Sequence, residues 1–243
     1  MIEMTETPKA DIAEIARPMF SGVAPCYNAI RKEVIGDCVL YQGDCIDVLP
    51  CLPSVDAVIS DPPYPNGAGL FLDGVKQARA FMCLYNCEQW LIFWDEMTEP
   101  PMPQPLVAKH LWYRTNSNRP DNYELIYHLH ADGRKRASRV LPFAVIALGL
   151  TGCHEATIHP TQKNKKLMIK LLEMSKAESV VDPFMGSGTT GVACARQGKQ
   201  FVGIEREPKY FDIACKRIER AYQTRPRLFD AVKENVPNRE SLF

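Results

Sequence analysis

The second half of the chain alternates helical and strand-like patterns, and this alternation constrains the fold more than any other feature. Between residues 165 and 223 the order is an amphipathic helix (KKLMIKLLEMS), a strand (SVVDPF), a helix closed by Gly198 (TTGVACARQG), a strand (QFVGIERE) and a helix that begins at Pro208. Strands that alternate with helices form a mostly parallel sheet with helices on both faces. We therefore predict an α/β domain of this architecture.

Four apolar runs in the first half read as further strands. VDAVIS and EQWLIFWDE have the composition of buried strands, whereas HLWYRTN and NYELIYHLH suit an antiparallel pair at the sheet edge. The domain organisation that follows is an N-terminal extension over residues 1–35, one large domain over 36–223 and a C-terminal tail over 224–243.

Composition narrows the function classes. Of 243 residues 46% are hydrophobic, and 29 basic side chains balance 29 acidic ones. A net charge of zero gives no indication of a nucleic-acid partner, so any contact with nucleic acid would need a local patch of basic side chains. No apolar run has the length of a membrane span, and nine irregularly spaced cysteines fit reduced thiols in the cytoplasm. Cys83 and Cys87 could share a zinc ion, but no second pair stands at metal-ligand spacing, so we expect no metal.

A glycine-rich loop follows the strand SVVDPF and contains a literal G-x-G-x-x-G at Gly186, Gly188 and Gly191. Such a loop suits any adenosine cofactor, a nicotinamide dinucleotide included, and Glu205 ends the next strand where an acidic residue can bind ribose hydroxyls. An ordinary tight turn is the alternative. Asp182 argues against a dinucleotide because its carboxylate would repel a pyrophosphate, and it favours a cationic ligand group.

The strand VDAVIS runs directly into DPPY, Asp61 to Tyr64. Two prolines stop the strand and stiffen the loop, at the strand end where open α/β sheets bind their ligands. An amine bound to the Asp61 carboxylate and the Pro62 carbonyl would be held with its lone pair directed outward. Pro63 fixes the geometry, and Tyr64 offers a flat face for stacking a base removed from its helix.

With SDPPY, HPTQK (His159 to Lys163) and DPFMGSGTT in this order, the sequence resembles the amino-group DNA methyltransferases that use S-adenosylmethionine, in their circularly permuted β group. The resemblance covers about residues 39–223. It implies a Rossmann-like, class I methyltransferase-like fold, S-adenosylmethionine as cofactor and double-stranded DNA as partner. The implied reaction is direct methyl transfer to an exocyclic amine of a flipped-out base. Aspartate before PPY favours N6 of adenine, with N4 of cytosine as the alternative.

The resemblance also implies roles for single residues. Asp61, Pro62, Pro63 and Tyr64 would hold the target base, Asp44 would lie near the cofactor adenine, and Glu205 would bind the ribose. Thr161 and Lys163 would help to hold the carboxylate end of the cofactor. The methionine part would be surrounded by Asp182, Phe184, Gly186, Ser187, Gly188 and Thr189. One departure is Asn164, which replaces the proline that usually follows HPTQK.

Target recognition is expected from the short insertion at residues 131–158. Its basic cluster comprises Arg134, Lys135, Arg136 and Arg139. We expect this cluster to contact DNA phosphates, with one or two arginines reaching guanine edges, and a solvated loop is the alternative. So short a region predicts a short target or help from a second subunit in a homodimer.

Three other functions compete with this interpretation. A carbon-5 cytosine methyltransferase would use the Pro50–Cys51 pair, a dehydrogenase would bind a nicotinamide dinucleotide, and a degenerate relative would bind nucleic acid without methylating it. The first two have no use for SDPPY. The third predicts damage to DPPY or to the glycine loop, and both are intact.

Overall fold

The computed structural model describes residues 29–63, 80–81, 85–94, 104–115, 122–143 and 163–224. Over these residues the strands form one sheet in the order β1-β2-β9-β8-β3-β4-β6-β5-β7. The strands are β1 (Arg31–Ile35), β2 (Cys38–Gln42), β3 (Ala57–Ser60), β4 (Gln89–Trp94), β5 (Leu106–Tyr113), β6 (Tyr123–His130), β7 (Val140–Pro142), β8 (Ser179–Asp182) and β9 (Gln200–Glu205). The helices are α1 (Cys45–Val48), the 3-10 helix η2 (Leu49–Cys51), α3 (Lys165–Ser175), α4 (Thr189–Gln197) and α5 (Pro208–Gln223). None of these helices combines the length and the hydropathy that crossing a membrane requires.

The centre of the sheet is parallel, as the alternating pattern predicts. Strands β2, β9, β8, β3 and β4 share one direction. β6 is antiparallel to both β4 and β5, so the predicted antiparallel pair of strands is confirmed. The pair is not the outermost part of the sheet, however, because β7 adds beside β5 in the parallel sense.

The opposite edge of the sheet is β1, which pairs antiparallel with β2 from Arg31 to Ile35. The predicted extension over 1–35 therefore includes a strand of the domain, and its boundary was placed too far along the chain. The sequence RKEVI hides this strand because its charged residues are exposed, as is common at sheet edges. Arg31 also reaches α5, with Nη1 2.6 Å from Asp212 Oδ1.

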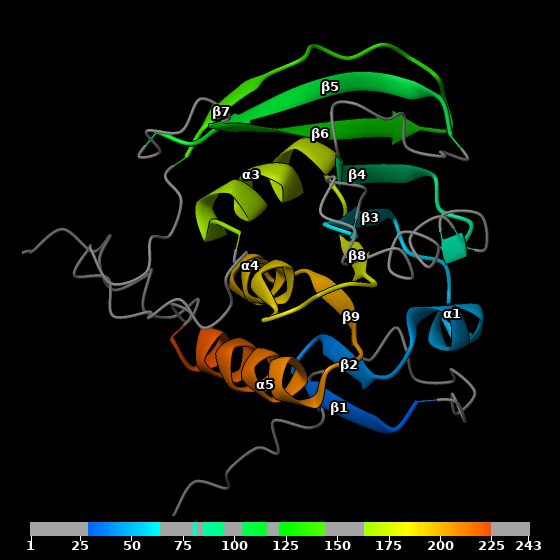
Figure 1. Ribbon diagram of the computed structural model, residues 1–243, viewed down its shortest axis with the longest axis vertical. Coiled ribbons are helices and arrows are strands. Elements are labelled where there is room, and N and C mark those ends of the chain that lie inside the picture. The colour runs from blue at the N-terminus through cyan, green and yellow to red at the C-terminus, as the bar shows by residue number, and fades with distance from the viewer. Residues whose placement is uncertain are drawn as a thin grey trace, which may run out of the picture.

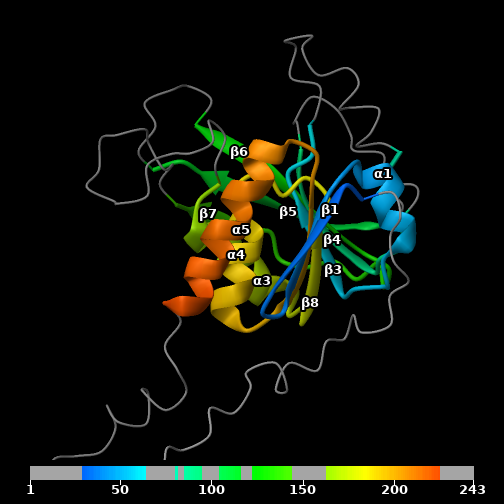
Figure 2. The ribbon, with the colours of Figure 1, turned by 90° about the horizontal axis from the view of Figure 1, so that it is seen from below.

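Helices cover both faces of the sheet. Figure 1 shows α3, α4 and α5 side by side on one face, and Figure 2, with the sheet nearly edge-on, shows α1 on the other. Successive side chains of a strand point to opposite faces. Leu40 and Ile59 accordingly pack against the three helices, whereas Tyr41 and Val58 enter the core on the α1 side. Burial on both faces explains why the parallel strands read as continuous apolar runs.

Two glycines of the glycine-rich loop are required by packing. Gly188 has φ +76°, and a Cβ there would lie 2.8 Å from Ala214 Cβ on α5. Gly191, in the first turn of α4, would place a Cβ 2.5 Å from Ile218 Cδ1 and 2.7 Å from Phe201 Cε1. Helix α4 can therefore approach β9 and α5 this closely only where both positions lack a side chain.

Gly191→Ala is expected to lower the free energy of unfolding by about 1–3 kcal/mol, the usual effect of overpacking a filled core. Urea denaturation followed by circular dichroism measures the change. Because Ile218→Val removes the Cδ1 atom that the new methyl group meets, Gly191→Ala should be less damaging in an Ile218→Val background. Wild-type stability in Gly191→Ala would contradict this packing account.

Candidate active site

The predicted acidic residues meet at one edge of the sheet, where the parallel strands end. Asp61 follows β3, Asp182 ends β8, Glu205 ends β9, and Asp44 stands two residues after β2. The ends of β2 and β9 are held at one level, since Gly43 N donates to Glu205 O at 3.1 Å. This edge is the place where α/β sheets bind ligands.

Asp182 is buried and joins three elements through its carboxylate. Its Oδ1 accepts from Ser60 Oγ at 2.7 Å and from Phe184 N at 3.2 Å, and its Oδ2 accepts from Thr190 Oγ1 at 2.6 Å. Burial raises the pKa of Asp182 to about 6, although these donors oppose the shift. Because Ser60 precedes Asp61, the carboxylate ties the Asp61 loop to the glycine loop and to α4.

Four of the predicted cofactor residues form a half-exposed acidic rim at the strand ends: Asp44, Phe184, Gly186 and Glu205. The Glu205 carboxylate supports the glycine loop, accepting from Gly186 N at 2.9 Å and from Glu207 N at 2.8 Å. Asp44 caps α1 by accepting from Ile46 N at 3.0 Å. The rim presents two carboxylates and an aromatic ring, which fit an adenosine with free ribose hydroxyls and disfavour a pyrophosphate.

Ser187 and Thr189, also predicted to contact the cofactor, are buried and held by Arg217 of α5. Arg217 Nη1 donates to Ser187 Oγ at 2.8 Å and to Thr189 Oγ1 at 3.4 Å. Sequence reasoning missed this arginine. The available signal is helical spacing, because Arg217 stands three residues after the buried Ala214 and four before the buried Ala221, on the inward face of α5.

Asp61 and Lys163 are in direct contact. Lys163 Nζ lies 2.9 Å from Asp61 Oδ2 and 2.6 Å from Glu124 Oε2. The other Asp61 oxygen, Oδ1, is buried and has no hydrogen-bond partner among the described residues. Burial raises the pKa of Asp61, and the Lys163 ammonium opposes that shift. A buried acceptor without a partner is costly, so Oδ1 is the atom at which a ligand donor is expected.

The ammonium of Lys163 therefore lies between two protein carboxylates. The resemblance implies a different partner for Lys163, the carboxylate end of the cofactor. Its neighbour Asn164, the departure from the family motif, is the N-cap of α3. Asn164 Oδ1 accepts from Lys166 N at 2.8 Å and from Leu167 N at 3.4 Å. Asparagine is a favoured N-cap, and proline has no side-chain acceptor for this purpose. The departure thus has a structural role.

The basic cluster does not lie beside Asp61. β6 runs away from the Asp61 end of the sheet, because it is antiparallel to β4, and residues 134–136 follow its far end. Arg139 is fixed beside the middle of β5, where its N donates to His110 Nδ1 at 3.1 Å. β7, which follows Arg139, is four strand positions from β3, or roughly 19 Å at the usual spacing. The cluster therefore lies on the side of the domain formed by β5 and β7, away from Asp61.

Two of the four cluster side chains already have protein partners. Arg136 Nη2 lies 3.0 Å from Asp132 Oδ2, and Lys135 Nζ donates to Leu106 O at 2.7 Å. Arg134 and Arg139 are exposed, and neither side chain forms an ion pair within the described ranges. These two arginines are therefore the members most available to a phosphate.

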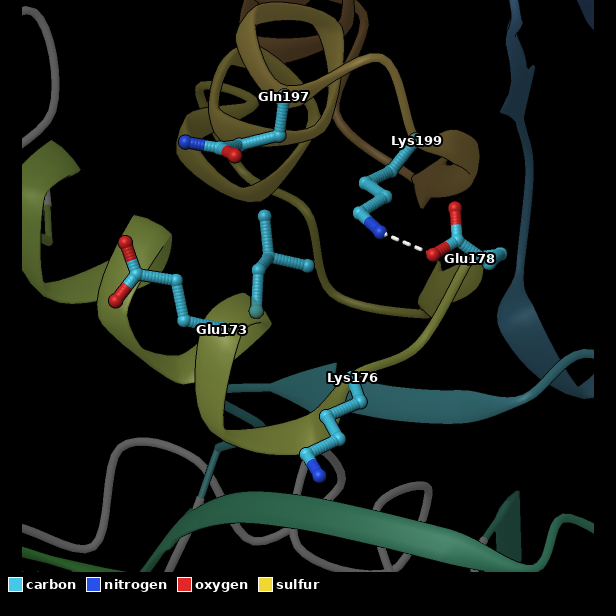
Figure 3. Close-up of a pocket in the computed structure, with 6 residues that line it drawn as sticks. Glu173, Lys176, Glu178, Gln197 and Lys199 are labelled. Atoms are coloured by element: carbon cyan, nitrogen blue, oxygen red, sulfur yellow. Dashed lines mark hydrogen bonds and ion pairs between the residues drawn. The ribbon is translucent and has the colours of Figure 1, made fainter.

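A separate pocket of about 320 Å³ lies at the other end of the sheet, where β8 begins (Figure 3). Figure 3 shows Lys199 ion-paired with Glu178 at its rim. The pocket is lined by Leu172, Glu173, Lys176, Glu178, Gln197 and Lys199. None of these is a predicted site residue, and Asp182 stands at the opposite end of β8, so the pocket is no part of the candidate active site.

Several predicted positions lie outside the described residues: Tyr64, Thr161, Cys83 and residues 144–158 of the insertion. Cys51, which a carbon-5 mechanism would need as nucleophile, belongs to η2, and its Sγ lies 3.8 Å from Asp47 O. Because η2 leads into the start of β3, Cys51 is separated from Asp61 by the length of that strand.

The raised pKa of Asp182 predicts a pH-dependent stability. Its pKa is about 6 in the folded protein, against 3.8 for an ordinary aspartate. The folded state therefore binds the proton more tightly, and this group's contribution to stability rises as pH falls from 7 towards 4. Relative to Asp182→Asn, the wild type should gain about 1 kcal/mol of unfolding free energy between pH 7 and pH 5.

Urea denaturation of both proteins at pH 7, 6 and 5 measures this difference. Asp56→Asn is a matched control, because backbone and side-chain donors of Ser179 lower the pKa of Asp56 against its burial. Its contribution is lost only as pH falls below about 3.8, so the difference from wild type should stay constant over the same range. A constant difference for Asp182→Asn would refute the prediction.

Comparison with known proteins agrees with the motifs. Residues 101–216 match the family model N6_N4_Mtase, described as DNA methylase. The chain is 38% identical over 121 residues to the type II methyltransferase M2.DpnII of Streptococcus pneumoniae. That alignment covers 47% of this chain and 42% of the relative, so the chain matches less than half of that protein's length.

Two solved structures share the fold. The M1.HpyAVI–SAM complex has a TM-score of 0.57 at 24% identity, covering 74% of this chain and 98% of that one. The PvuII DNA methyltransferase, which is cytosine-N4-specific, has a TM-score of 0.57 at 14% identity, covering 81% and 95%. The predicted Rossmann-like α/β fold is thereby confirmed. By its motifs and by this match over residues 101–216, the chain is similar to the amino-group DNA methyltransferases, which act on adenine N6 or cytosine N4.

Proposed function

We propose that this protein transfers a methyl group from S-adenosylmethionine to the exocyclic N6 of an adenine flipped out of double-stranded DNA. The alternative is transfer to cytosine N4 by the same chemistry. The observation that carries the proposal is Asp61 Oδ1, a buried acceptor without a partner in the described part of the chain, at the end of β3. An exocyclic amine is a donor of the size and charge that this atom requires.

The cofactor assignment is supported by the acidic rim. Glu205 and Asp44 offer carboxylate oxygens for hydroxyl and amine donors, and Phe184 offers a ring for a flat base. S-adenosylmethionine, when bound, supplies an electrophilic methyl group on a sulfonium. A nicotinamide dinucleotide fits less well, because its pyrophosphate would lie among Asp44, Asp182 and Glu205. Asp182 acts in this proposal through the loops that it holds, since its carboxylate oxygens accept from Ser60, Phe184 and Thr190.

Catalysis in this proposal is positioning and electrostatics. Asp61 Oδ1 accepts one N–H of the target amine, and the Pro62 carbonyl accepts the other, so that the nitrogen lone pair points at the cofactor. The amine nitrogen would displace the neutral thioether from the methyl carbon, so that the N–CH3 bond forms as the S–CH3 bond breaks. The nitrogen would gain positive charge, which the Asp61 carboxylate would stabilise, and would then lose one proton to water. The amine is itself the nucleophile, so no covalent enzyme intermediate is needed.

DNA contact is proposed at the exposed arginines of the basic cluster, Arg134 and Arg139. β7, which follows Arg139, lies roughly 19 Å across the sheet from β3, and Arg134 follows the far end of β6, so both arginines would contact flanking phosphates rather than the target base. Base recognition is left to residues elsewhere in the insertion. Lys135 and Arg136 would contribute less, because both have protein partners.

The proposal is tested by incubating the protein with labelled S-adenosylmethionine and methyl-free duplex DNA, and identifying the digested nucleosides by mass spectrometry. The expected product is N6-methyladenine. Asp61→Ala should lower kcat by about 100-fold or more, because it removes the oriented acceptor, while cofactor binding is retained. Asp212→Ala, an exposed aspartate on α5, is the matched control and should remain active.

The nucleoside product separates the alternatives. N4-methylcytosine would keep the mechanism and change the base. Cofactor binding without any methylated nucleoside, on DNA of varied sequence, would reject the proposed function. Full activity of Asp61→Ala would reject the role of Asp61 even if DNA is methylated.

Replacing both Arg134 and Arg139 by alanine should weaken DNA binding equally for all sequences. Two lost phosphate contacts should reduce the slope of log affinity against log salt concentration by about 2. Fluorescence anisotropy at several salt concentrations measures both effects. A variant in which Lys176 and Lys199, beside the separate pocket, are replaced controls for the loss of two charges. An unchanged salt slope would refute the phosphate contacts.

A further inference from the structure

We propose that Glu124 is a positioning residue of the methyl-transfer site: it holds the Lys163 ammonium, which fixes one Asp61 oxygen and leaves the other for the target amine. Glu124 lies on β6, outside every motif of the sequence. The inference rests on the proposed function, since it concerns the Asp61 that binds the amine there.

Lys163 is enclosed by contacts from four different strands or strand ends. Its Nζ lies 2.9 Å from Asp61 Oδ2 after β3, and 2.6 Å from Glu124 Oε2 on β6. It also lies 4.6 Å from the ring centroid of Phe93 on β4 and 5.6 Å from that of Trp112 on β5. The side chain is 11% exposed. Carboxylates and aromatic faces on several sides leave an ammonium little freedom to move.

Glu124 is in turn fixed by Arg114, which follows β5. Glu124 Oε1 forms an ion pair with Arg114 while Oε2 binds Lys163, and the Arg114 guanidinium lies 5.4 Å from the Trp112 ring centroid. Positive and negative groups thus alternate along a row from Arg114 through Glu124 and Lys163 to Asp61. A row of little-exposed charges is tolerated when each has an opposite partner, and removal of one member leaves its neighbour unmatched.

The arrangement determines which Asp61 oxygen is free. Without Glu124, the Lys163 ammonium would lose the second carboxylate that it contacts and could bridge both oxygens of Asp61. Glu124 draws the ammonium to the Oδ2 side, and Oδ1 keeps no partner within the described chain. An amine donor then finds one acceptor at a fixed place, which is the geometry that in-line transfer needs.

Burial is the main reason that the pKa of Asp61 is raised, and three charged groups act on it in opposite directions. Lys163 and Arg114 lower the pKa of Asp61, and Glu124 raises it; the neighbouring acid on β8 is Asp182. Neutralising Glu124 and Lys163 separately shifts the pKa of Asp61 in opposite directions by charge alone. The positioning role predicts in addition that kcat falls when Glu124 is neutralised and returns when its charge is restored.

The first test is a titration of the Asp61 carboxyl carbon by ¹³C nuclear magnetic resonance, with the signal assigned by its loss in Asp61→Asn. Glu124→Gln should lower the pKa of Asp61, and Lys163→Gln should raise it. Glu124→Asp keeps the charge and should stay near wild type. Glu178→Gln is the matched control: it neutralises the glutamate that is ion-paired with Lys199 at the far end of β8, and it should leave the pKa of Asp61 unchanged.

The second test is steady-state kinetics of methyl transfer. Glu124→Gln should lower kcat by roughly ten- to a hundredfold, because Asp61 is misplaced, while the KM for S-adenosylmethionine changes little. Glu124→Asp should restore most of kcat. If Glu124→Gln alone folds poorly, the double variant Arg114→Gln/Glu124→Gln removes a balanced pair, and it should fold while kcat stays low.

An unchanged Asp61 pKa in Glu124→Gln overturns the positioning role, and so does a wild-type kcat in a folded Glu124→Gln protein. A loss of kcat in folded Glu124→Gln that Glu124→Asp restores, together with shifts of opposite sign in Glu124→Gln and Lys163→Gln, supports it. A wild-type protein that methylates no base overturns the proposed function instead, and the titration still decides whether Glu124 controls Asp61.

Discussion

The arrangement of the candidate site depends on the hydrogen bonds that the Asp182 carboxylate accepts from Ser60 and Thr190. Backbone pairing between β3 and β8 joins Ala57 to Val180 and Val58 to Val181. Further along, the two strands are joined by the hydrogen bond between the Ser60 and Asp182 side chains, at the level where the Asp61 loop and the glycine loop leave the sheet. Burial of a carboxylate costs free energy, which three donors only partly offset. The protein keeps this costly group where two loops have to be held in register.

The electrostatics of the site are local and bear no relation to the neutral overall charge. Asp61, Asp182 and Glu205 stand at neighbouring strand ends, and burial raises the pKa of all three. Within the described residues, Asp61 is the one of these three acids that is matched by a cation, Lys163, which Glu124 shares. The remaining carboxylates are supported by hydroxyl and backbone N–H donors. This division suits a site where one acid meets a neutral amine and the others support loops beside a cationic cofactor.

The glycine loop shows how one motif can serve packing and binding together. Gly186 is half-exposed and its N is held by Glu205, so it belongs to the rim. Gly188 and Gly191 are needed because Ala214, Phe201 and Ile218 come close to them. A literal dinucleotide fingerprint therefore arises here from close packing of α4 on β9 and α5, and it says little about the cofactor by itself. The acidic surroundings discriminate between ligands.

The sequence by itself determined the parallel α/β core, the antiparallel β5–β6 pair, the helix ends at Pro208 and Gly198, and the residues of the three motifs. These features follow from periodicity and turn chemistry, which act over a few neighbouring residues. Only the tertiary structure decided that β1 joins the sheet, that the basic cluster lies to one side, and that Arg217, Glu124 and Arg114 support the site. The contacts of Arg217 and Glu124 join residues far apart in the chain, 30 positions for Ser187–Arg217 and 39 for Glu124–Lys163, and so does the Ser60–Asp182 contact, over 122 positions. The sequence around each of these polar residues does not show which distant residue it will contact, because the partners come together only when the strands assemble into the sheet.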